Sequence, residues 1–372
     1  MSDFHVGTQI YSGKTALDQL NEIQQQRILL VCDPFLKDSA TLEEITAHFN
    51  ATNTTVIFAD VKPNPPLTNI QMGVVEFNQF HPTVIVAVGG GSAIDTAKAI
   101  RFFGEKISQN KIDCFIAIPT TSGTGSEVTN TAVVSDEQNN VKFPIIEDYL
   151  IPDIALLYPE LVMSAPKSVS AFSGLDVLTH ALEALVAKDA NLFTDALAEK
   201  VISVMCHDLT QVYQQPDNYE LREVVHQASN AAGIAFNQAG LGITHAIAHQ
   251  LGAMFHVPHG LACAMVLPHV IAYNAQDPKS LAKYATAARK AGLINGSTSD
   301  QVAVKKIIYQ IKAMMRTMNC PTTLTKFGVK AATANQAVDR IVSGAKSDGT
   351  FPGNPIIPTD QALASIYKKV IG

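Results

Sequence analysis

The sequence predicts an α/β N-terminal domain with a Rossmann-like parallel sheet, followed by an all-α C-terminal domain. Short apolar runs rich in Val and Ile recur through the first half of the chain, and stretches with helical spacing lie between them. Such alternation is typical of a doubly wound sheet. Strand signals end after about residue 165. Since 372 residues suffice for about two domains, we expect the boundary there, with domains 1–165 and 166–372.

The expected strands are apolar on consecutive positions, which is typical of a sheet covered on both faces. They occupy residues 27–33, 54–60, 83–90, 113–120 and 153–159. Helical spacing predicts helices in 41–49 and 92–103 between them. Residues 131–146 differ, because two extended arms flank the polar segment DEQNN and predict a β-hairpin.

Residues beyond the boundary follow the helical period. Helices are expected in 170–187, 194–209 and 302–318. The last of these has one apolar face, formed by Val304, Ile307, Ile308, Ile311, Met314 and Met318. Pro321 follows it and cannot continue the helical hydrogen bonds.

Composition and charge exclude several classes of protein. The net charge is −6 with no basic stripe, so we expect no nucleic-acid partner. No run of 18 apolar residues predicts a membrane span, and the N-terminus has no signal-peptide pattern. Five dispersed cysteines without a C-x-x-C pair indicate reduced thiols. We therefore expect a cytoplasmic enzyme.

A glycine-rich turn follows the strand at 83–88. Gly90 and Gly91 allow a phosphate to approach the backbone, and Ser92 can cap the next helix or donate to a phosphate oxygen. Asp95 lies in the first turn of that helix, where a negative charge is favourable, and is a further candidate cofactor-binding residue. A tight, well-capped turn without a ligand is an equal alternative, because the pattern is not G-x-G-x-x-G.

Two further features favour a dinucleotide at the same edge. The loop 120–130 follows another strand and is dense in hydroxyls suited to sugar and phosphate oxygens. Its candidate ligands are Thr120, Thr121, Thr124 and Ser126. Asp33 ends the first strand, where a carboxylate can bind a ribose and repel a 2′-phosphate, which favours NAD over NADP. The alternative is that Asp33 only opens a turn.

Histidines are concentrated late in the chain. Five of the 11 lie between 245 and 269, and His245 and His249 share one helical face at i, i+4. Asp176 and His180 have the same spacing. With His259, these residues provide carboxylate and imidazole donors suited to zinc or ferrous iron.

The candidate metal ligands are Asp176, His180, His245 and His259. Spacing alone leaves three roles open for His249: a further metal ligand, a partner that orients a ligand, or a catalytic proton shuttle.

The chain resembles the iron-containing (group III) alcohol dehydrogenase family. The stretches GGGSAIDTAKA, IPTTSGTGSEVTNTAVVSD, GLDVLTHALEA, FTDALAEK and AGLGITHAIAHQLGAMFHVPHGLACAMVLP carry the resemblance. It implies the two-domain architecture shared with dehydroquinate synthase, NAD(H) as cofactor and Fe²⁺, or alternatively Zn²⁺, as metal. The family ligand pattern falls on the same aspartate and three histidines. Its cofactor positions fall on Asp33, Asn64, Gly90, Gly91, Ser92, Thr120, Thr121, Thr124, Ser126, Lys142 and Leu161.

The activity implied is reversible reduction of a short-chain aldehyde by NADH, with propionaldehyde favoured and 3-hydroxypropionaldehyde also considered. A homo-oligomer is expected, with association with a bacterial microcompartment as a further possibility. Alternatives are a zinc polyol dehydrogenase of the glycerol type and a metal or nucleotide sensor without turnover. A dehydroquinate-synthase-like lyase is disfavoured, because its anionic substrate needs basic side chains and only Lys188 lies near the loops 171–187 and 240–262.

Overall fold

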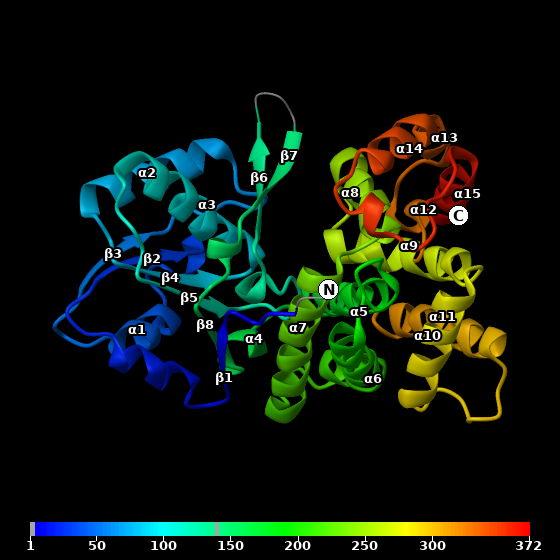
Figure 1. The fold of residues 1–372 in the computed structure, drawn as a ribbon, viewed down its shortest axis with the longest axis horizontal. Coiled ribbons are helices and arrows are strands. Elements are labelled where there is room, and N and C mark those ends of the chain that lie inside the picture. The colour runs from blue at the N-terminus through cyan, green and yellow to red at the C-terminus, as the bar shows by residue number, and fades with distance from the viewer. Residues whose placement is uncertain (1–3, 138–140) are drawn as a thin grey trace. The chain divides into compact units, whose positions relative to one another are not determined.

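The chain divides into two units, and each is described by itself. The computed structural model describes residues 4–137 and 141–372, without the side chains of residues 141 and 142. One unit is His5–Ala165, and the other is Pro166–Gly372 together with Phe4 (Figure 1). Phe4 was expected in the first domain, but its ring stacks on Phe193 with centroids 5.1 Å apart.

The first unit contains a parallel sheet with strand order β1-β8-β5-β4-β2-β3. The strands are β1 (Gln9–Ser12), β2 (Arg27–Cys32), β3 (Thr54–Phe58), β4 (Val84–Gly89), β5 (Cys114–Pro119) and β8 (Ile154–Leu157). Its helices are α1 (Ala40–Ala47), α2 (Leu67–Phe80), α3 (Gly91–Ser108) and α4 (Glu160–Met163). The predicted α/β class is confirmed.

Both faces of this sheet are buried, which explains the uninterrupted apolar runs. In β2, Leu30 belongs to the core cluster that includes residues of α1, and Leu29 to the cluster that includes residues of α2 and α3. Neighbouring strands repeat the alternation, for example Val86 and Ile85 in β4. Each fully buried Val, Leu or Ile side chain contributes about 1.5–3 kcal/mol relative to an exposed one.

The order in which parallel strands are added to the sheet reverses between β2 and β4. From β2 the chain passes to β3 on one side, and β4 then pairs with the other side of β2. In open α/β sheets, ligands bind beyond the carboxyl ends of the strands at such a reversal. Asp33 follows β2 and the glycine turn follows β4, so both lie at this point.

The predicted hairpin is present as β6 (Thr131–Asp136) and β7 (Val141–Ile146), paired antiparallel. The short strand β1 was missed. It lies at the sheet edge, and its sequence QIYS is mostly exposed, so it lacks the apolar run that marks the inner strands.

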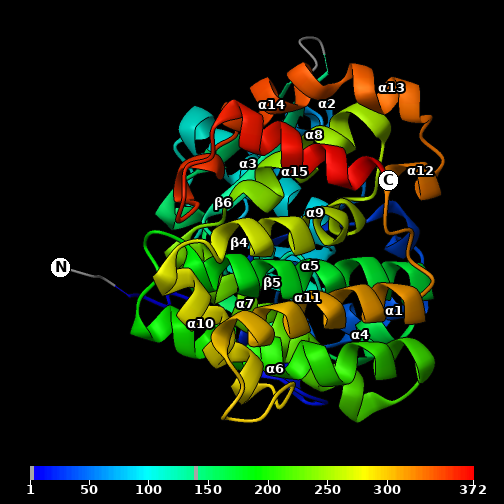
Figure 2. The ribbon, with the colours of Figure 1, turned by 90° about the vertical axis from the view of Figure 1, so that its right-hand side faces the viewer.

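Helices make up the second unit. They are α5 (Lys167–Val186), α6 (Leu192–Gln214), α7 (Tyr219–Ala239), α8 (Ile243–Phe255), α9 (His259–Asn274), α10 (Pro278–Lys290), α11 (Asp300–Thr317), α12 (Leu324–Phe327), α13 (Ala331–Gln336), α14 (Val338–Lys346) and α15 (Asp360–Ile371). Figure 2 shows α5 and α9, far apart in the sequence, lying side by side.

Helix α5 is largely buried, with 15 of its 20 residues almost inaccessible to solvent. Among the described residues it alone has the length and apolar composition to cross a membrane, but 83% of its apolar window is buried inside the protein. It is therefore the core helix of a bundle.

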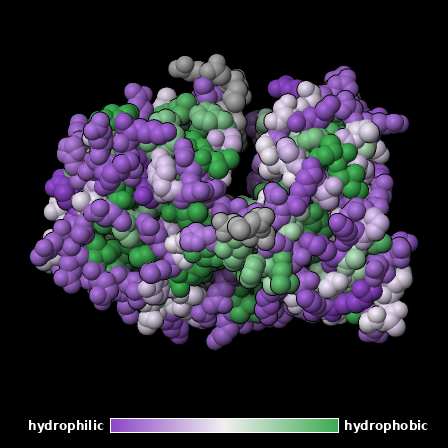
Figure 3. All heavy atoms as spheres, viewed as in Figure 1, coloured by the Kyte–Doolittle hydropathy of each residue, from purple (hydrophilic) through white to green (hydrophobic). Residues whose placement is uncertain are grey.

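Hydrophilic residues predominate on the face drawn in Figure 3.

Candidate metal centre and nucleotide site

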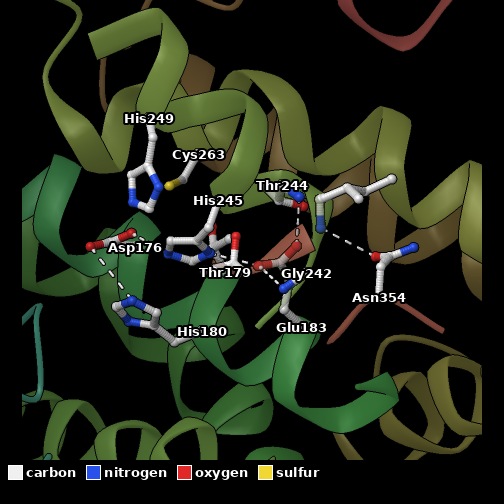
Figure 4. Close-up of polar contacts among 12 residues, drawn as sticks. Asp176, Thr179, His180, Glu183, Gly242, Thr244, His245, His249, Cys263 and Asn354 are labelled. Atoms are coloured by element: carbon white, nitrogen blue, oxygen red, sulfur yellow. Dashed lines mark hydrogen bonds and ion pairs between the residues drawn. The ribbon is translucent and has the colours of Figure 1, made fainter. Parts of the chain in front are cut away.

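Three helices provide the candidate metal ligands. Helix α5 carries Asp176 and His180, α8 carries His245 and His249, and α9 begins at His259. Because residues at i and i+4 share a helical face, α5 and α8 each direct their pair to one side. Figure 4 shows the side chains from α5 and α8 pointing toward one another.

The four candidate ligands come together although 83 residues separate the first from the last. Oδ1 of Asp176 lies 3.7 Å from Nε2 of His245 and 3.6 Å from Nε2 of His259. Oδ2 of Asp176 lies 4.0 Å from Nε2 of His180. The rings of His180 and His245 stack with centroids 4.8 Å apart. One carboxylate is thus surrounded by three imidazoles.

Gly260 permits this approach. A Cβ at this position would lie 2.0 Å from the carbonyl oxygen of Phe172 and 3.0 Å from Cβ of Asp176. The start of α9 can therefore lie directly against α5, which brings His259 beside Asp176. Pro258 precedes the helix and provides no N–H that would need a partner there.

Glu183 fixes the orientation of His245. Its Oε2 accepts a hydrogen bond from Nδ1 of His245 at 2.6 Å, which directs Nε2 toward Asp176. The same carboxylate accepts from the backbone N–H groups of Gly242 (3.1 Å) and Thr244 (2.7 Å) at the start of α8. A carboxylate behind a histidine is the arrangement that orients imidazole ligands in metal sites.

The charges of the cluster favour a cation. Burial alone would lower the pKa of His245, but the carboxylates of Asp176 and Glu183 raise it well above its usual value. Burial alone would raise the pKa of Asp176, but the imidazoles of His259, His180 and His245 hold that pKa below its usual range. Burial, together with the neighbouring imidazoles, instead lowers the pKa of His259 to about 3 despite the charge of Asp176, so His259 presents the neutral imidazole that binds a metal ion.

Two buried atoms test whether a metal fits. Oδ1 of Asp176 and Nε2 of His245 have no hydrogen-bond partner among the described residues, although the two residues are only 4% and 2% exposed. Unpaired buried polar atoms are costly. A divalent ion bound by oxygen and imidazole nitrogen would satisfy both atoms, so the residues present fit zinc or ferrous iron.

His249 lies at the edge of the cluster. Its Nδ1 donates to Oδ2 of Asp348 at 2.7 Å, and its ring stacks on His259 with centroids 5.3 Å apart. Its side chain is 41% exposed, unlike the buried His245. The candidate ligand His259 is equally exposed, at 43%, so this position is compatible both with a proton shuttle oriented by a carboxylate and with a further ligand.

The predicted nucleotide residues gather at the reversal point of the first unit. The N–H of Gly90 donates to Oδ2 of Asp33 at 3.4 Å. Gly89 has a φ of +154°, and a Cβ there would lie 2.5 Å from the same oxygen. The N–H of Thr120 donates to the carbonyl of Gly89 at 3.0 Å, which joins the hydroxyl-rich loop to the glycine turn.

Two threonines of this loop lie directly against the glycine turn. A Cβ at Gly90 would lie 3.4 Å from the side chain of Thr121, and a Cβ at Gly91 would lie 2.8 Å from that of Thr124. The hydroxyls of the loop and the backbone of the turn therefore share one edge of the sheet, as a bound dinucleotide requires.

Asp95 has a different role from the one predicted. Its Oδ1 accepts from the hydroxyl of Ser126 at 2.6 Å, and its Oδ2 accepts from the N–H of Val133 at 3.0 Å. Buried Lys98 donates to the same hydroxyl at 3.2 Å and to the carbonyl of Thr129 at 2.7 Å. Both oxygens of Asp95 are thus used inside the protein. Asp95 and Ser126 hold the hydroxyl-rich loop against α3, and the geometry does not support a cofactor contact by Asp95.

The other predicted cofactor residues are Ser92, Asn64, Leu161 and Lys142. Ser92 lies in the first turn of α3. Asn64 is exposed with a φ of +52°, a conformation that asparagine tolerates. Leu161 is 7% exposed and packs in the core beneath the sheet. The side chain of Lys142 lies outside the described part of the chain.

Sequence reasoning missed Glu183, Asp348, Lys98 and Cys263. Glu183 lies seven residues after Asp176 on the same helix, so its spacing was a usable signal. Lys98 stands at i+3 from Asp95, which is also a local signal. Asp348 is 99 residues from His249, and no local pattern connects them.

A parallel α/β unit with a nucleotide-type edge and a helical unit with a carboxylate–imidazole cluster define a metal-dependent dehydrogenase. Residues 7–159 match the iron-containing alcohol dehydrogenase family, and residues 170–371 match the C-terminal part of the Fe-containing alcohol dehydrogenase family. The chain belongs to this family. It is an oxidoreductase of a family that uses NAD(H) and iron.

Similar proteins agree with this assignment. A 1-propanol dehydrogenase of Citrobacter freundii is 39% identical, with all of both chains covered. The crystal structure of a 1,3-propanediol oxidoreductase matches with a TM-score of 0.91 and 32% identity over all of both chains. A sulfoacetaldehyde reductase of Bifidobacterium kashiwanohense, solved with NAD⁺, matches with a TM-score of 0.89 and 25% identity over 100% of this chain and 98% of that one. The stretches YSG, SGLDVLTHALEA and AIAHQLG predict similarity to the propanol dehydrogenase of bacterial 1,2-propanediol utilisation, and the first relative confirms it.

Proposed function

We propose that the chain reversibly reduces a short-chain aldehyde with NADH, and that propionaldehyde, giving 1-propanol, is the preferred substrate. The convergence of Asp176, His180, His245 and His259 supports the metal chemistry. The 39% identity to a 1-propanol dehydrogenase supports the substrate. The 1,3-propanediol oxidoreductase structure makes 3-hydroxypropionaldehyde the second candidate.

The divalent ion and NADH would have different roles in the reaction. When bound, the divalent ion supplies a Lewis acid for the aldehyde oxygen and NADH supplies the hydride. Asp176, His180, His245 and His259 would hold the ion, and Glu183 keeps the Nε2 of His245 directed toward it. Asp33 would accept hydrogen bonds from the ribose, and the glycine turn would face the pyrophosphate.

The chain also controls the proton and water. His249, oriented by Asp348, would deliver the proton that the product alcohol needs and recover it in the reverse direction. Phe236 stacks on His180 with centroids 4.4 Å apart and keeps water from that side of the ligand. Exclusion of water by an apolar side chain strengthens the electrostatic interactions of the site.

An aldehyde panel tests the proposal. NADH oxidation is measured anaerobically with propionaldehyde, 3-hydroxypropionaldehyde and acetaldehyde, with and without added Fe²⁺ or Zn²⁺, alongside elemental analysis. We expect metal-dependent turnover that is fastest with propionaldehyde. In a parallel assay of NAD⁺ reduction, preferential oxidation of glycerol with zinc would favour a polyol dehydrogenase. Binding of metal and NADH without turnover in either assay would favour a sensor. Sedimentation of the same preparation tests the expected homo-oligomer. Cytoplasmic localisation and association with a microcompartment stay predictions.

The Asp33→Gly variant should lose its preference for NADH. Without the carboxylate, a 2′-phosphate is no longer repelled and the ribose loses an acceptor. We expect the ratio of kcat/KM for NADPH to that for NADH to rise by about tenfold or more. Asp38→Gly removes an exposed carboxylate five residues away and serves as the control. An unchanged ratio in Asp33→Gly contradicts the proposed role.

The His249→Ala variant should separate a proton shuttle from a ligand. As a shuttle, its loss should lower kcat by about 10²-fold, the lower end for acid–base groups, and leave metal content nearly intact. Asp348→Asn should lower kcat by a smaller factor, since the imidazole remains and only its orientation weakens. Metal content is measured by elemental analysis. Loss of metal from His249→Ala would instead identify a ligand.

A further inference from the structure

A thiol faces the candidate metal centre. Cys263 lies one turn after His259 on α9 and is fully buried. Its Sγ is 3.8 Å from Nε2 of His259. Figure 4 shows the sulfur pointing into the space beside His245 and His249. The donor atoms of Cys263, His259, His245 and Asp176 all lie within 4.8 Å of one another.

The surroundings of Cys263 differ from those of an ordinary packing thiol. Cys206 and Cys320 also lie in the core of the helical unit, but neither belongs to a group of metal-type donors in the described part of the chain. Cys263 lies beside Oδ1 of Asp176 and Nε2 of His245, the two buried atoms that lack a hydrogen-bond partner. These unpaired atoms are an independent sign of a cation-binding position at the place where the sulfur points.

Three of the six separations among these four donors suit one shared ion, and all six are within 4.8 Å. Two donors bound at about 2.0–2.3 Å and at a tetrahedral angle lie about 3.3–3.8 Å apart. The three separations are 3.6 Å (Asp176 to His259), 3.7 Å (Asp176 to His245) and 3.8 Å (Cys263 to His259). His180 approaches the other oxygen of Asp176, at 4.0 Å.

We propose that Cys263 is a sulfur donor to the metal ion of this chain, an inference that rests on the proposed metal-dependent function. As the sulfur–metal bond forms, the thiol S–H bond breaks and its proton leaves to solvent, with no change of oxidation state. A thiolate in the donor set favours zinc, cobalt and ferrous iron over harder ions such as magnesium or manganese.

Cobalt substitution tests this directly. Metal-stripped full-length chain is titrated with Co²⁺ under anaerobic conditions, and its absorption spectrum is recorded. Wild-type protein should show a near-ultraviolet sulfur-to-cobalt charge-transfer band in addition to the visible ligand-field bands. Cys263→Ser should lose the charge-transfer band completely and keep the ligand-field bands. Cys114→Ser, in the other unit, should keep both.

Wild-type protein provides a readout that needs no variant. X-ray absorption at the zinc edge of the Zn²⁺-loaded chain should reveal a sulfur at about 2.3 Å in addition to nitrogen and oxygen at about 2.0–2.2 Å. A zinc shell of nitrogen and oxygen alone, or a charge-transfer band that survives in Cys263→Ser, overturns the role of Cys263 and leaves the proposed function intact. Failure to take up either ion contradicts the proposed metal site itself.

Discussion

The His259→Ala variant should lose its metal and its turnover together. His259 provides the nitrogen closest to Oδ1 of Asp176, at 3.6 Å, and comes from a different helix. Removing an outer partner of a ligand already lowers metal affinity about 10–100-fold, so removing a ligand should lower it by at least about 100-fold. We expect activity below about 1% of wild type, in proportion to that loss of affinity. Elemental analysis and the aldehyde assay measure the two effects.

The fold should survive this substitution, which makes the result easy to interpret. The side chain of His259 is 43% exposed, so its truncation leaves no buried cavity. NADH binding, followed by fluorescence, should persist because Asp33 and the glycine turn belong to the other unit. His256→Asn is the matched control: it changes an exposed histidine three residues away whose φ of +55° asparagine accepts. Full activity in His259→Ala would remove this residue from the site.

The fold class was predictable because its signal is local. Strands buried on both faces must be apolar at every position, and Leu29 and Leu30 of β2 show this in adjacent residues. The edge strand β1 has no such requirement, so QIYS gave no signal. Helix α2 was also not predicted. Its buried Ile70, Val74 and Phe77 have helical spacing, but the same run contains Asn69 and Gly73, which weaken the helical pattern.

The candidate site was only partly predictable. Pairs at i, i+4 on α5 and α8 are visible in the sequence, because a single helix brings such residues to one face. Their convergence depends on packing between helices, and Gly260 against the carbonyl of Phe172 is the contact that permits it. Asp348 could not be predicted, because only the tertiary fold brings it to His249. For Asp95, the sequence shows its place in the first turn of α3 but not the direction of its carboxylate.

The Glu183→Gln variant should bind metal about 10–100-fold more weakly than wild type, although Glu183 is not itself a candidate ligand. Its carboxylate accepts from Nδ1 of His245 and from two backbone N–H groups at the start of α8. Glutamine has one oxygen and one NH₂ group, so it cannot accept all three hydrogen bonds. His245 then loses the partner that directs its Nε2 toward Asp176. Zn²⁺ titration against a chelator measures the change.

The loss of unfolding free energy in Glu183→Gln, relative to wild type, should depend on pH. Burial opposes ionisation of Glu183, but His245 and the N–H groups outweigh burial and hold the pKa of Glu183 below its usual value. A lowered folded-state pKa stabilises the fold above the unfolded pKa of about 4.3, and this stabilisation is lost as the pH falls through the folded pKa. For metal-free protein at pH 7, we expect Glu183→Gln to lower the free energy of unfolding by about 3 kcal/mol, the lower end for breaking a buried ion pair.

The difference between wild type and variant, measured by urea denaturation, should therefore be largest between about pH 4 and about pH 6.5. It should narrow below that range as Glu183 is protonated, and above it as the pH rises through the raised pKa of His245, because the charged imidazole that Glu183 stabilises is then lost. Glu220→Gln, on the exposed first turn of α7, should change neither metal affinity nor this pH dependence. If Glu183→Gln keeps the wild-type affinity for zinc while losing stability, Glu183 only caps α8 and does not orient the ligand. If both quantities fall together, one carboxylate holds the helix start and the metal ligand at once, because His245 lies in the first turn that Glu183 caps.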